Sequence, residues 1–222
     1  MEKSITVVGG DLRIVKLVEM LDKDGYDVYT YGLENADELL CLEGVAMCPT
    51  LEEAVSHSKV VVGPIPLSSD KKRVSTPFGR NFVELEDFIE VLKGKYLIAG
   101  NIGIKEELDA NQIQCTDLLK REEFSVLNTI ATAEGTIQIA MEETQRTVHG
   151  TNTLIMGFGR IGKVLAKMLD GIGANVYCEA RKDEDISWIK AYGYNPIHLN
   201  NLSEHLEKFD IIINTIPFQV LD

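Results

Sequence analysis

The sequence predicts an α/β protein, with a flavodoxin-like or Rossmann-like N-terminal domain and a C-terminal Rossmann domain. Short runs of β-branched residues alternate with amphipathic helical stretches along the 222 residues, which is typical of parallel sheets covered by helices on both faces. One long helical stretch divides the chain into two halves, and a glycine-rich turn follows an apolar strand in the second half. The expected domains are residues 1–122, a connecting helix over 123–150, and residues 151–222.

The first domain is expected to begin with a buried strand over residues 5–8, which ends in Gly9-Gly10. Asp11 is the expected N-cap of the next helix, and Gly25 ends that helix. This turn lacks the glycine spacing of a dinucleotide site, so we expect a cap or a cleft-facing turn there, and no second cofactor. Further strands are predicted over 27–31, 45–47, 60–62, 96–99 and 112–115, and helices near 51–57, 84–92 and 105–110.

The connecting region is predicted to be a single helix with a loop at its start. No glycine or proline interrupts it after Gly135 until His149-Gly150, where the glycine would supply a left-handed cap. The hydroxyl-rich run from Thr129 to Thr136 is expected to lead into this helix. Thr132 then either caps the helix, or the unpaired N–H groups there suit a substrate carboxylate.

The C-terminal domain is expected to be a partial dinucleotide fold. A complete one normally continues with two more strands, so we expect either a truncation or a missing edge that something else supplies. The predicted strands lie over 153–156, 175–178, 196–199 and 210–214, and the predicted helices run to about residue 171, near 184–192 and near 202–207.

Composition excludes several classes of function. The chain has 22 Lys plus Arg against 35 Asp plus Glu, a formal net charge of −13, which argues against nucleic acid as the main partner. No apolar run approaches the ~20 residues that span a bilayer, so no membrane association is expected, and the N-terminus lacks the features of a signal peptide. Four cysteines form no CxxC pair, so neither a metal site nor disulfides are expected. We expect a cytoplasmic protein, and homo-oligomer formation stays open.

The motif that carries most information is Gly157-Phe158-Gly159-Arg160-Ile161-Gly162, which joins an apolar strand to an amphipathic helix. In that context the pattern favours a turn that binds a dinucleotide, and not merely a tight turn that binds no ligand. Gly157 permits the turn, Gly159 lets the backbone approach a pyrophosphate, and Gly162 lets the helix pack closely. The helix N-terminus offers N–H groups and a partial positive charge to the phosphates.

Two cues for cofactor preference conflict at the end of the next strand. Glu179 stands where an acid would bind the adenine ribose hydroxyls of NAD, whereas Arg181 and Lys182 stand where cations would hold the 2′-phosphate of NADP. The two cations favour NADP slightly. Asn214-Thr215-Ile216-Pro217 follows a later strand, so Thr215 and Pro217 are expected either near the pyrophosphate or nicotinamide, or in a turn stopped by proline.

Outside the dinucleotide motif, one loop combines cations with glycine and proline. Residues 63–81 carry Lys71-Lys72-Arg73 and Arg80, with Asp70 as the one acid. In so acidic a protein this pattern indicates either capture of an anion or a solvated mobile loop. None of the four histidines stands in a catalytic spacing, and we assign no catalytic residue.

With these segments identified, the chain resembles the A-subunit family of dipicolinate synthase from spore-forming bacteria. The resemblance covers essentially the whole chain and rests on residues 5–11, 124–128, 132–135, 140–144, 149–150, 157–162, 180–181 and 214–217. It implies an architecture similar to formate and glycerate dehydrogenases. Glu179 departs from the small residue often found there in the family.

The resemblance implies oxidation of dihydrodipicolinate to dipicolinate with NADP or NAD, together with the B-subunit of dipicolinate synthase, in the mother-cell cytoplasm during sporulation. Aromatisation of the ring would supply much of the driving force. The substrate is a small dicarboxylate, for which Thr132, Arg80 and Lys72 are the candidate binding residues. Two alternatives stay open: a regulatory subunit that binds NAD(P) without chemistry, and a hydroxyacid dehydrogenase of the formate/glycerate type.

Overall fold

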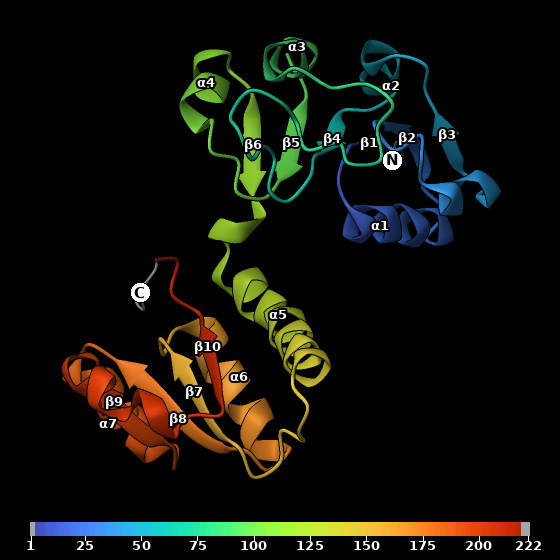
Figure 1. Cartoon of the computed structure of the whole chain (residues 1–222). Helices are drawn as coiled ribbons and strands as arrows, with labels where there is room; N and C mark the ends of the chain where they lie inside the picture. Colours follow the sequence, from blue (N-terminus) through green and yellow to red (C-terminus); the bar gives the residue numbers. More distant parts are fainter. Residues whose placement is uncertain (1–2, 219–222) are drawn as a thin grey trace. The chain divides into compact units, whose positions relative to one another are not determined.

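The computed structural model describes residues 3–218 and divides into two compact units that meet between Glu122 and Glu123 (Figure 1). Both units are built on parallel sheets, so the predicted α/β class is confirmed. Among the described residues, no helix is long and apolar enough to cross a membrane.

The first unit contains a six-stranded parallel sheet in the order β3-β2-β1-β4-β5-β6. Of the two alternatives left open by the sequence, this is the Rossmann-like order, which reverses direction between β1 and β4. The strands are β1 (Ser4–Val8), β2 (Asp27–Tyr31), β3 (Val45–Met47), β4 (Val60–Val62), β5 (Tyr96–Ala99) and β6 (Gln114–Asp117).

Helices cover both faces of this sheet, as Figure 1 shows. The helix α1 (Leu12–Lys23) and the 3₁₀ helix η1 (Asp37–Cys41) pack on one face, where Val15, Val18 and Leu39 are buried together. The other face carries α2 (Leu51–Ser56), α3 (Leu85–Val91) and α4 (Lys105–Ala110), whose core includes Phe88 and Leu108. Burial of these apolar stripes holds the layers together.

The expected strand over 112–115 is displaced by two residues. Gln112 adopts a φ of +58° and its N–H donates to Asp109, while the N–H of Ile113 donates to Leu108. These bonds finish α4, so β6 starts only at Gln114. A short 3₁₀ helix, η2 (Leu118–Lys120), follows β6 and was not predicted.

The connecting helix α5 runs over Glu122–Glu143, so it starts within one residue of the predicted boundary at 123 but ends seven residues before the predicted end at 150. There is no loop at its start, and Thr132 lies inside the helix, where its hydroxyl donates to the carbonyl of Asn128. The helix ends at Glu143 instead of near His149-Gly150. The hydroxyl of Thr144 donates to the carbonyls of Ala140 and Arg146, and Val148 then enters the core of the second unit.

The second unit contains a four-stranded parallel sheet in the order β10-β7-β8-β9. Its strands are β7 (Asn152–Met156), β8 (Asn175–Ala180), β9 (Asn195–His198) and β10 (Ile211–Asn214). The helices α6 (Arg160–Gly171) and α7 (Asp183–Ala191) share one buried core with α5. The predicted helix near 202–207 is instead a longer 3₁₀ helix, η3 (Leu199–Lys208), packed on the opposite face.

Candidate dinucleotide-binding site

The turn between β7 and α6 is built so closely that two of its glycines cannot be replaced without movement. Gly157 has a φ of +92°, and a Cβ there would lie 2.9 Å from both Ile216 and Thr215. A Cβ on Gly162 would lie 2.2 Å from the carbonyl oxygen of Gly157. These contacts bring the start of α6 directly against the turn, at the edge where the carboxyl ends of the strands meet.

Gly159 lies in a different environment from the other two glycines. A Cβ at this position would meet nothing within 4 Å, so its surroundings are open. Gly159 is also the N-cap of α6, and it has no side chain to accept a hydrogen bond from the first turn. The N-terminal end of α6 is therefore left without a side-chain cap, beside open space that an anion can enter.

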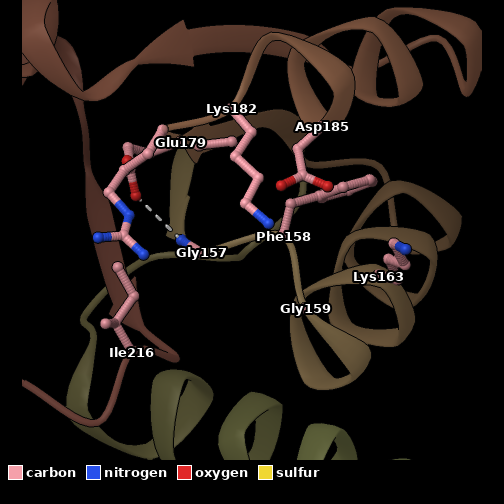
Figure 2. A pocket seen from close by; sticks show the side chains of 10 residues that line it. Gly157, Phe158, Gly159, Lys163, Glu179, Lys182, Asp185 and Ile216 are labelled. Carbon is pink, nitrogen blue, oxygen red and sulfur yellow. Dashed lines mark hydrogen bonds between the residues drawn. The ribbon is translucent and has the colours of Figure 1, made fainter.

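A cavity of about 340 Å³ adjoins this turn (Figure 2). This volume lies within the range of small-molecule sites. The cavity is lined from the turn, from the end of β8, from the start of α7 and from the segment after β10. The lining residues are Gly157, Phe158, Gly159, Lys163, Glu179, Ala180, Arg181, Lys182, Asp185 and Ile216.

Glu179 is a buried carboxylate in the wall of this cavity. Its Oε2 atom accepts a hydrogen bond of 3.2 Å from the backbone N–H of Gly157, drawn as a dashed line in Figure 2. Its Oε1 atom is buried and has no hydrogen-bond partner. Burial raises the pKa of Glu179, although the Gly157 N–H and the charges of Arg181 and His198 act in the opposite direction.

The unpartnered oxygen of Glu179 fits a bound dinucleotide. A buried acceptor without a donor costs free energy, and a ribose hydroxyl at this edge would supply the donor. The neighbouring Cys178 is buried, and burial raises its pKa to about 12, so its thiol stays protonated and is not a nucleophile.

Six of the predicted cofactor residues line this cavity, namely Gly157, Phe158, Gly159, Glu179, Arg181 and Lys182. Arg160, Ile161 and Gly162 form the first turn of α6 and are not part of the lining. Thr215 is held against the turn, because its hydroxyl donates to the carbonyl of Met156 at 2.9 Å. Ile216 lines the cavity instead, and Pro217 does not.

Sequence analysis missed Lys163 and Asp185, which also line the cavity (Figure 2). Lys163 lies one helical turn after Gly159, and Asp185 lies in the first turn of α7. Helical spacing from the glycine motif was the available signal for Lys163. Asp185 depends on how α7 packs beside α6, which no local pattern indicates.

In the first unit, the candidate substrate residues Lys72 and Arg80 do not line the same cavity. Lys72 lines a cavity of about 540 Å³ in the first unit, together with the acids Glu84, Glu86, Asp87 and Glu107. Arg80 is exposed, is not part of that lining, and its backbone N–H donates to Glu34. Thr132 lies in the middle of α5, so the expectation of unpaired N–H groups at this residue was wrong.

Comparison with known proteins identifies the family. Residues 4–119 match the model of the N-terminal domain of the dipicolinate synthase A-subunit. Across 222 residues the chain is 30% identical to the A-subunit of dipicolinate synthase of Bacillus subtilis (strain 168), covering 98% of this chain and 74% of the relative. The chain belongs to the dipicolinate synthase A-subunit family. The resemblance stated from the sequence is thereby confirmed.

The second unit matches a cofactor domain. Residues 117–220 match the NAD binding domain of D-isomer specific 2-hydroxyacid dehydrogenases. Membership of the dipicolinate synthase A-subunit family together with this domain gives the chain an oxidoreductase-type role with an NAD(P) cofactor, so the predicted cofactor class is confirmed. The family's designation as the A-subunit of an enzyme implies a partner polypeptide.

Solved structures agree with this assignment. The A-subunit of dipicolinate synthase from Bacillus subtilis matches with a TM-score of 0.80 and 28% identity, over 100% of this chain and 75% of that one. The A-subunit from Bacillus halodurans matches with a TM-score of 0.83 and 26% identity, over 99% and 76% of the two chains. A transhydrogenase from Sinorhizobium meliloti, at 16% identity and a TM-score of 0.60 over 98% and 71%, shares the fold.

Proposed function

We propose that this chain oxidises dihydrodipicolinate to dipicolinate with NADP as the preferred cofactor, together with the B-subunit of dipicolinate synthase, in the mother-cell cytoplasm during sporulation. The observation that carries this proposal is the cavity at the β7 turn, which combines an uncapped helix N-terminus with two cations at the end of β8. It occurs in a chain of the dipicolinate synthase A-subunit family.

Different residues at the cavity would bind different parts of the cofactor. The backbone at Gly159 and the first turn of α6, Arg160 to Gly162, would hold the pyrophosphate. Arg181 and Lys182 would hold a 2′-phosphate, since charge-assisted hydrogen bonds from cations suit phosphate oxygens. The orphaned Oε1 atom of Glu179 would accept from a ribose hydroxyl. Thr215 supports the turn through its hydrogen bond to Met156.

The proposed reaction requires few functional side chains from the protein. A nicotinamide cofactor supplies the hydride acceptor when bound, and the ring also loses one proton as it becomes an aromatic pyridine. Water or a weak base can accept that proton. The remaining task is to orient a dicarboxylate, for which cations are the suitable partners. No catalytic acid, base or nucleophile is therefore assigned.

NADP is preferred over NAD because two cations, Arg181 and Lys182, line the cavity, whereas Glu179 is the single acid at the end of β8 and its Oε2 atom already accepts from the Gly157 amide. The Arg181→Ala variant should weaken NADP binding by roughly tenfold or more, since one charge-assisted hydrogen bond contributes about 1.5–3 kcal/mol. NAD binding should change little. Lys190→Ala, an exposed lysine later in α7, is the matched control. Equal losses for both cofactors, or no loss for NADP, would remove Arg181 from this role.

Turnover separates the enzyme from a regulatory polypeptide. The chain is mixed with the B-subunit, dihydrodipicolinate and NADP, and the absorbance of the reduced nicotinamide is followed. An increase that requires dihydrodipicolinate supports the proposed reaction, whereas binding of NADP without turnover supports the regulatory role. A D-2-hydroxy acid in the same assay tests the hydroxyacid dehydrogenase alternative, which the match of the second unit to that domain favours.

Substrate binding is tested at the two cations of the first unit. Arg80→Ala should raise the KM for dihydrodipicolinate. The Arg80 side chain is exposed and is not part of the cavity lining that contains the four acids, so its charge is accessible to a carboxylate of the substrate. Lys72→Ala should have the smaller effect, because Lys72 lies among four carboxylates that already balance its charge. Unchanged KM values in both variants would exclude this loop from substrate binding.

A further inference from the structure

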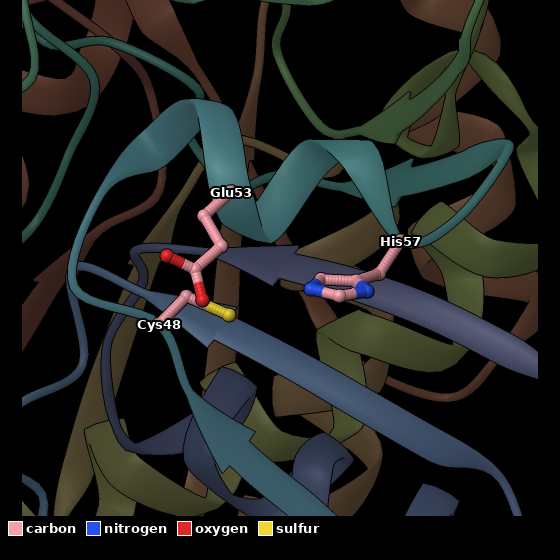
Figure 3. Close-up of side chains that lie close together, drawn as sticks. All are labelled: Cys48, Glu53 and His57. Atoms are coloured by element: carbon pink, nitrogen blue, oxygen red, sulfur yellow. The ribbon is translucent and has the colours of Figure 1, made fainter.

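Three side chains with metal-binding atoms lie together in the first unit, in the connection that follows β3 (Figure 3). They are Cys48, Glu53 and His57, and their candidate ligand atoms all lie within 4.8 Å of one another. This cluster has no part in the dinucleotide cavity, whose lining residues all belong to the second unit.

The local structure explains why the three side chains meet. Thr50 caps α2 by accepting from the N–H of Glu53, so α2 begins directly after the turn that contains Cys48. Glu53 lies in the first turn of α2, and His57 is its C-cap, four residues later. Residues four apart share one face of a helix, and this face is directed to the thiol (Figure 3).

Each of the three polar groups is available for a ligand. In residues 3–218, the Glu53 carboxylate and the His57 ring nitrogens make no hydrogen bond or ion pair. The Cys48 thiol has one weak contact, 3.9 Å to the carbonyl of Ala46. His57 stacks on Tyr29 with ring centroids 4.0 Å apart and an angle of 9° between the planes, which fixes the orientation of the imidazole.

We propose that Cys48, Glu53 and His57 bind one Zn²⁺ ion, with water as the fourth ligand. Thiolate, imidazole and carboxylate together form a donor set that Zn²⁺ accepts in tetrahedral geometry. Around such an ion the ligand atoms lie about 3.3–3.6 Å apart, so the cluster must close by roughly 1 Å. Glu53 is an exposed side chain and can make this movement, while the imidazole of His57 keeps its stacked orientation on Tyr29.

The charge of the cluster also suits a cation. The Cys48 thiol is buried, and it lies within 4.8 Å of a carboxylate oxygen of Glu53. A divalent ion placed between the thiol and the carboxylate supplies the opposite charge that this pair lacks. The spacing C-x₄-E-x₃-H differs from the CxxC pattern sought in the sequence, which is why no metal site was expected.

A bound ion would join the turn after β3, an edge strand, to both ends of α2. The expected consequence is stabilisation of the first unit, since metal that binds the folded state alone adds its binding free energy to folding. Thermal unfolding of the full chain should therefore shift upward with Zn²⁺. This effect is independent of dinucleotide binding, so failure of either proposal leaves the other intact.

Cobalt titration of the full chain, after removal of metals with a chelator, tests the site directly. We expect one equivalent of Co²⁺ to produce thiolate-to-metal charge-transfer absorption, and Zn²⁺ to displace it. Cys48→Ser should abolish this band, and His57→Asn should lower Zn²⁺ affinity by roughly 100-fold. Glu53→Gln should lower it by less.

The controls use neighbours outside the cluster. Cys41→Ser removes an exposed cysteine, and Glu52→Gln removes an exposed acid in the same turn of α2 as Glu53. Both should bind Co²⁺ as the unaltered chain does. His57→Asn and Glu53→Gln change exposed side chains and keep the test valid if Cys48→Ser does not fold. Absence of the charge-transfer band, or its survival in Cys48→Ser, would overturn the proposal.

Discussion

Both units contain a glycine turn that joins a strand to a helix. We call the turn after β1 closed, because backbone atoms of the chain pack against it, and the turn after β7 open, because a cavity adjoins it. After β1, the N–H of Gly10 donates to the carbonyl of Ser75, and a Cβ on Gly9 would lie 2.6 Å from that same oxygen. After β7, a Cβ on Gly159 would meet nothing within 4 Å. The first turn is covered by the chain's own backbone, whereas the second faces a cavity.

The helices that follow differ in the same way. Asp11 caps α1 by accepting from the N–H of Arg13 at 3.0 Å, so a carboxylate of the protein already satisfies that helix N-terminus. Gly159 provides no such group to α6. We therefore expect an anion to bind at the N-terminus of α6, where no side-chain cap is present, and not at the N-terminus of α1.

The largest effect is expected from closing the open turn. In Gly162→Ala, the new methyl group would lie 2.2 Å from the carbonyl oxygen of Gly157, so the turn or α6 must move. We expect loss of dinucleotide binding and a decrease of about 1–3 kcal/mol in the free energy of unfolding of the second unit. Denaturation followed by the fluorescence of Trp188, the one tryptophan of the chain, measures this.

Gly171→Ala is the control for that variant, because it adds a methyl group to the last residue of the same helix, where nothing lies within 4 Å. It should bind dinucleotide normally and should not lose stability. A Gly162→Ala protein that keeps both its stability and its dinucleotide affinity would show that close packing of α6 against the turn is not required.

A smaller effect is expected at the buried carboxyl of the open turn. Because burial raises the pKa of Glu179 above its ordinary value of 4.5, the folded state binds more protons than the unfolded state just above that pH. The free energy of unfolding should therefore fall as pH rises through this window. Glu179→Gln should remove this dependence and stabilise the cofactor-free chain at pH 8 by about 1 kcal/mol.

Denaturation of both proteins at pH 4 and pH 8, again followed by Trp188 fluorescence, checks this expectation. At pH 4, below the ordinary pKa of 4.5, the carboxyl is mostly protonated in both states, so the two proteins should differ much less in stability than at pH 8. If Glu179→Gln were instead less stable than the unaltered chain at pH 8, the ionised carboxylate would be stabilising in its present place.

The smallest effect is expected at the closed turn. Asp11→Ala should destabilise α1 by about 1 kcal/mol through loss of the cap, and should leave dinucleotide binding unchanged. Asp11→Asn keeps the cap and should lose less. The hydrogen bond from the Arg13 guanidinium lowers the pKa of Asp11. The stability that comes from this charged pair is therefore present above the ordinary carboxyl pKa and is lost as pH falls through the lowered pKa of Asp11.

Hydrogen exchange of the α1 amides measures that prediction, with the α6 amides as an internal reference. Faster exchange confined to α1 is the expected result. Equal exchange in Asp11→Ala and the unaltered chain would mean that another group satisfies the N-terminus of α1.

Much of this comparison could be predicted from the sequence. The runs of β-branched and aromatic residues located β2, β3, β4 and β5 with their observed boundaries, because these residue types are enriched in strands. The glycine spacing distinguishes the turn at Gly157 from the turn at Gly9, and Asp11 is the N-cap that was expected. These features depend on local chemistry, which the sequence contains.

The errors concern features set by tertiary packing. Threonine is a common cap residue, but Thr132 lies inside α5, where its hydroxyl donates to the carbonyl of Asn128, four residues earlier. The sequence does not distinguish a threonine that makes this bond from one that caps a helix. The end of α5 is decided by the burial of Val148 in the second core. The place of Asp185 in the cavity follows from the packing of α7, and the cluster at Cys48 follows from the angle between β3 and α2.

We claim that the open turn after β7 binds the pyrophosphate of a nicotinamide dinucleotide. Titration calorimetry of the folded full chain with NADP and with NAD tests it, alongside Gly159→Ala, in which a methyl group enters the open space without touching the protein. We predict binding to the unaltered chain and at least tenfold weaker binding to Gly159→Ala, about 1.4 kcal/mol, with equal thermal stability. Failure of the folded chain to bind either dinucleotide would contradict the claim.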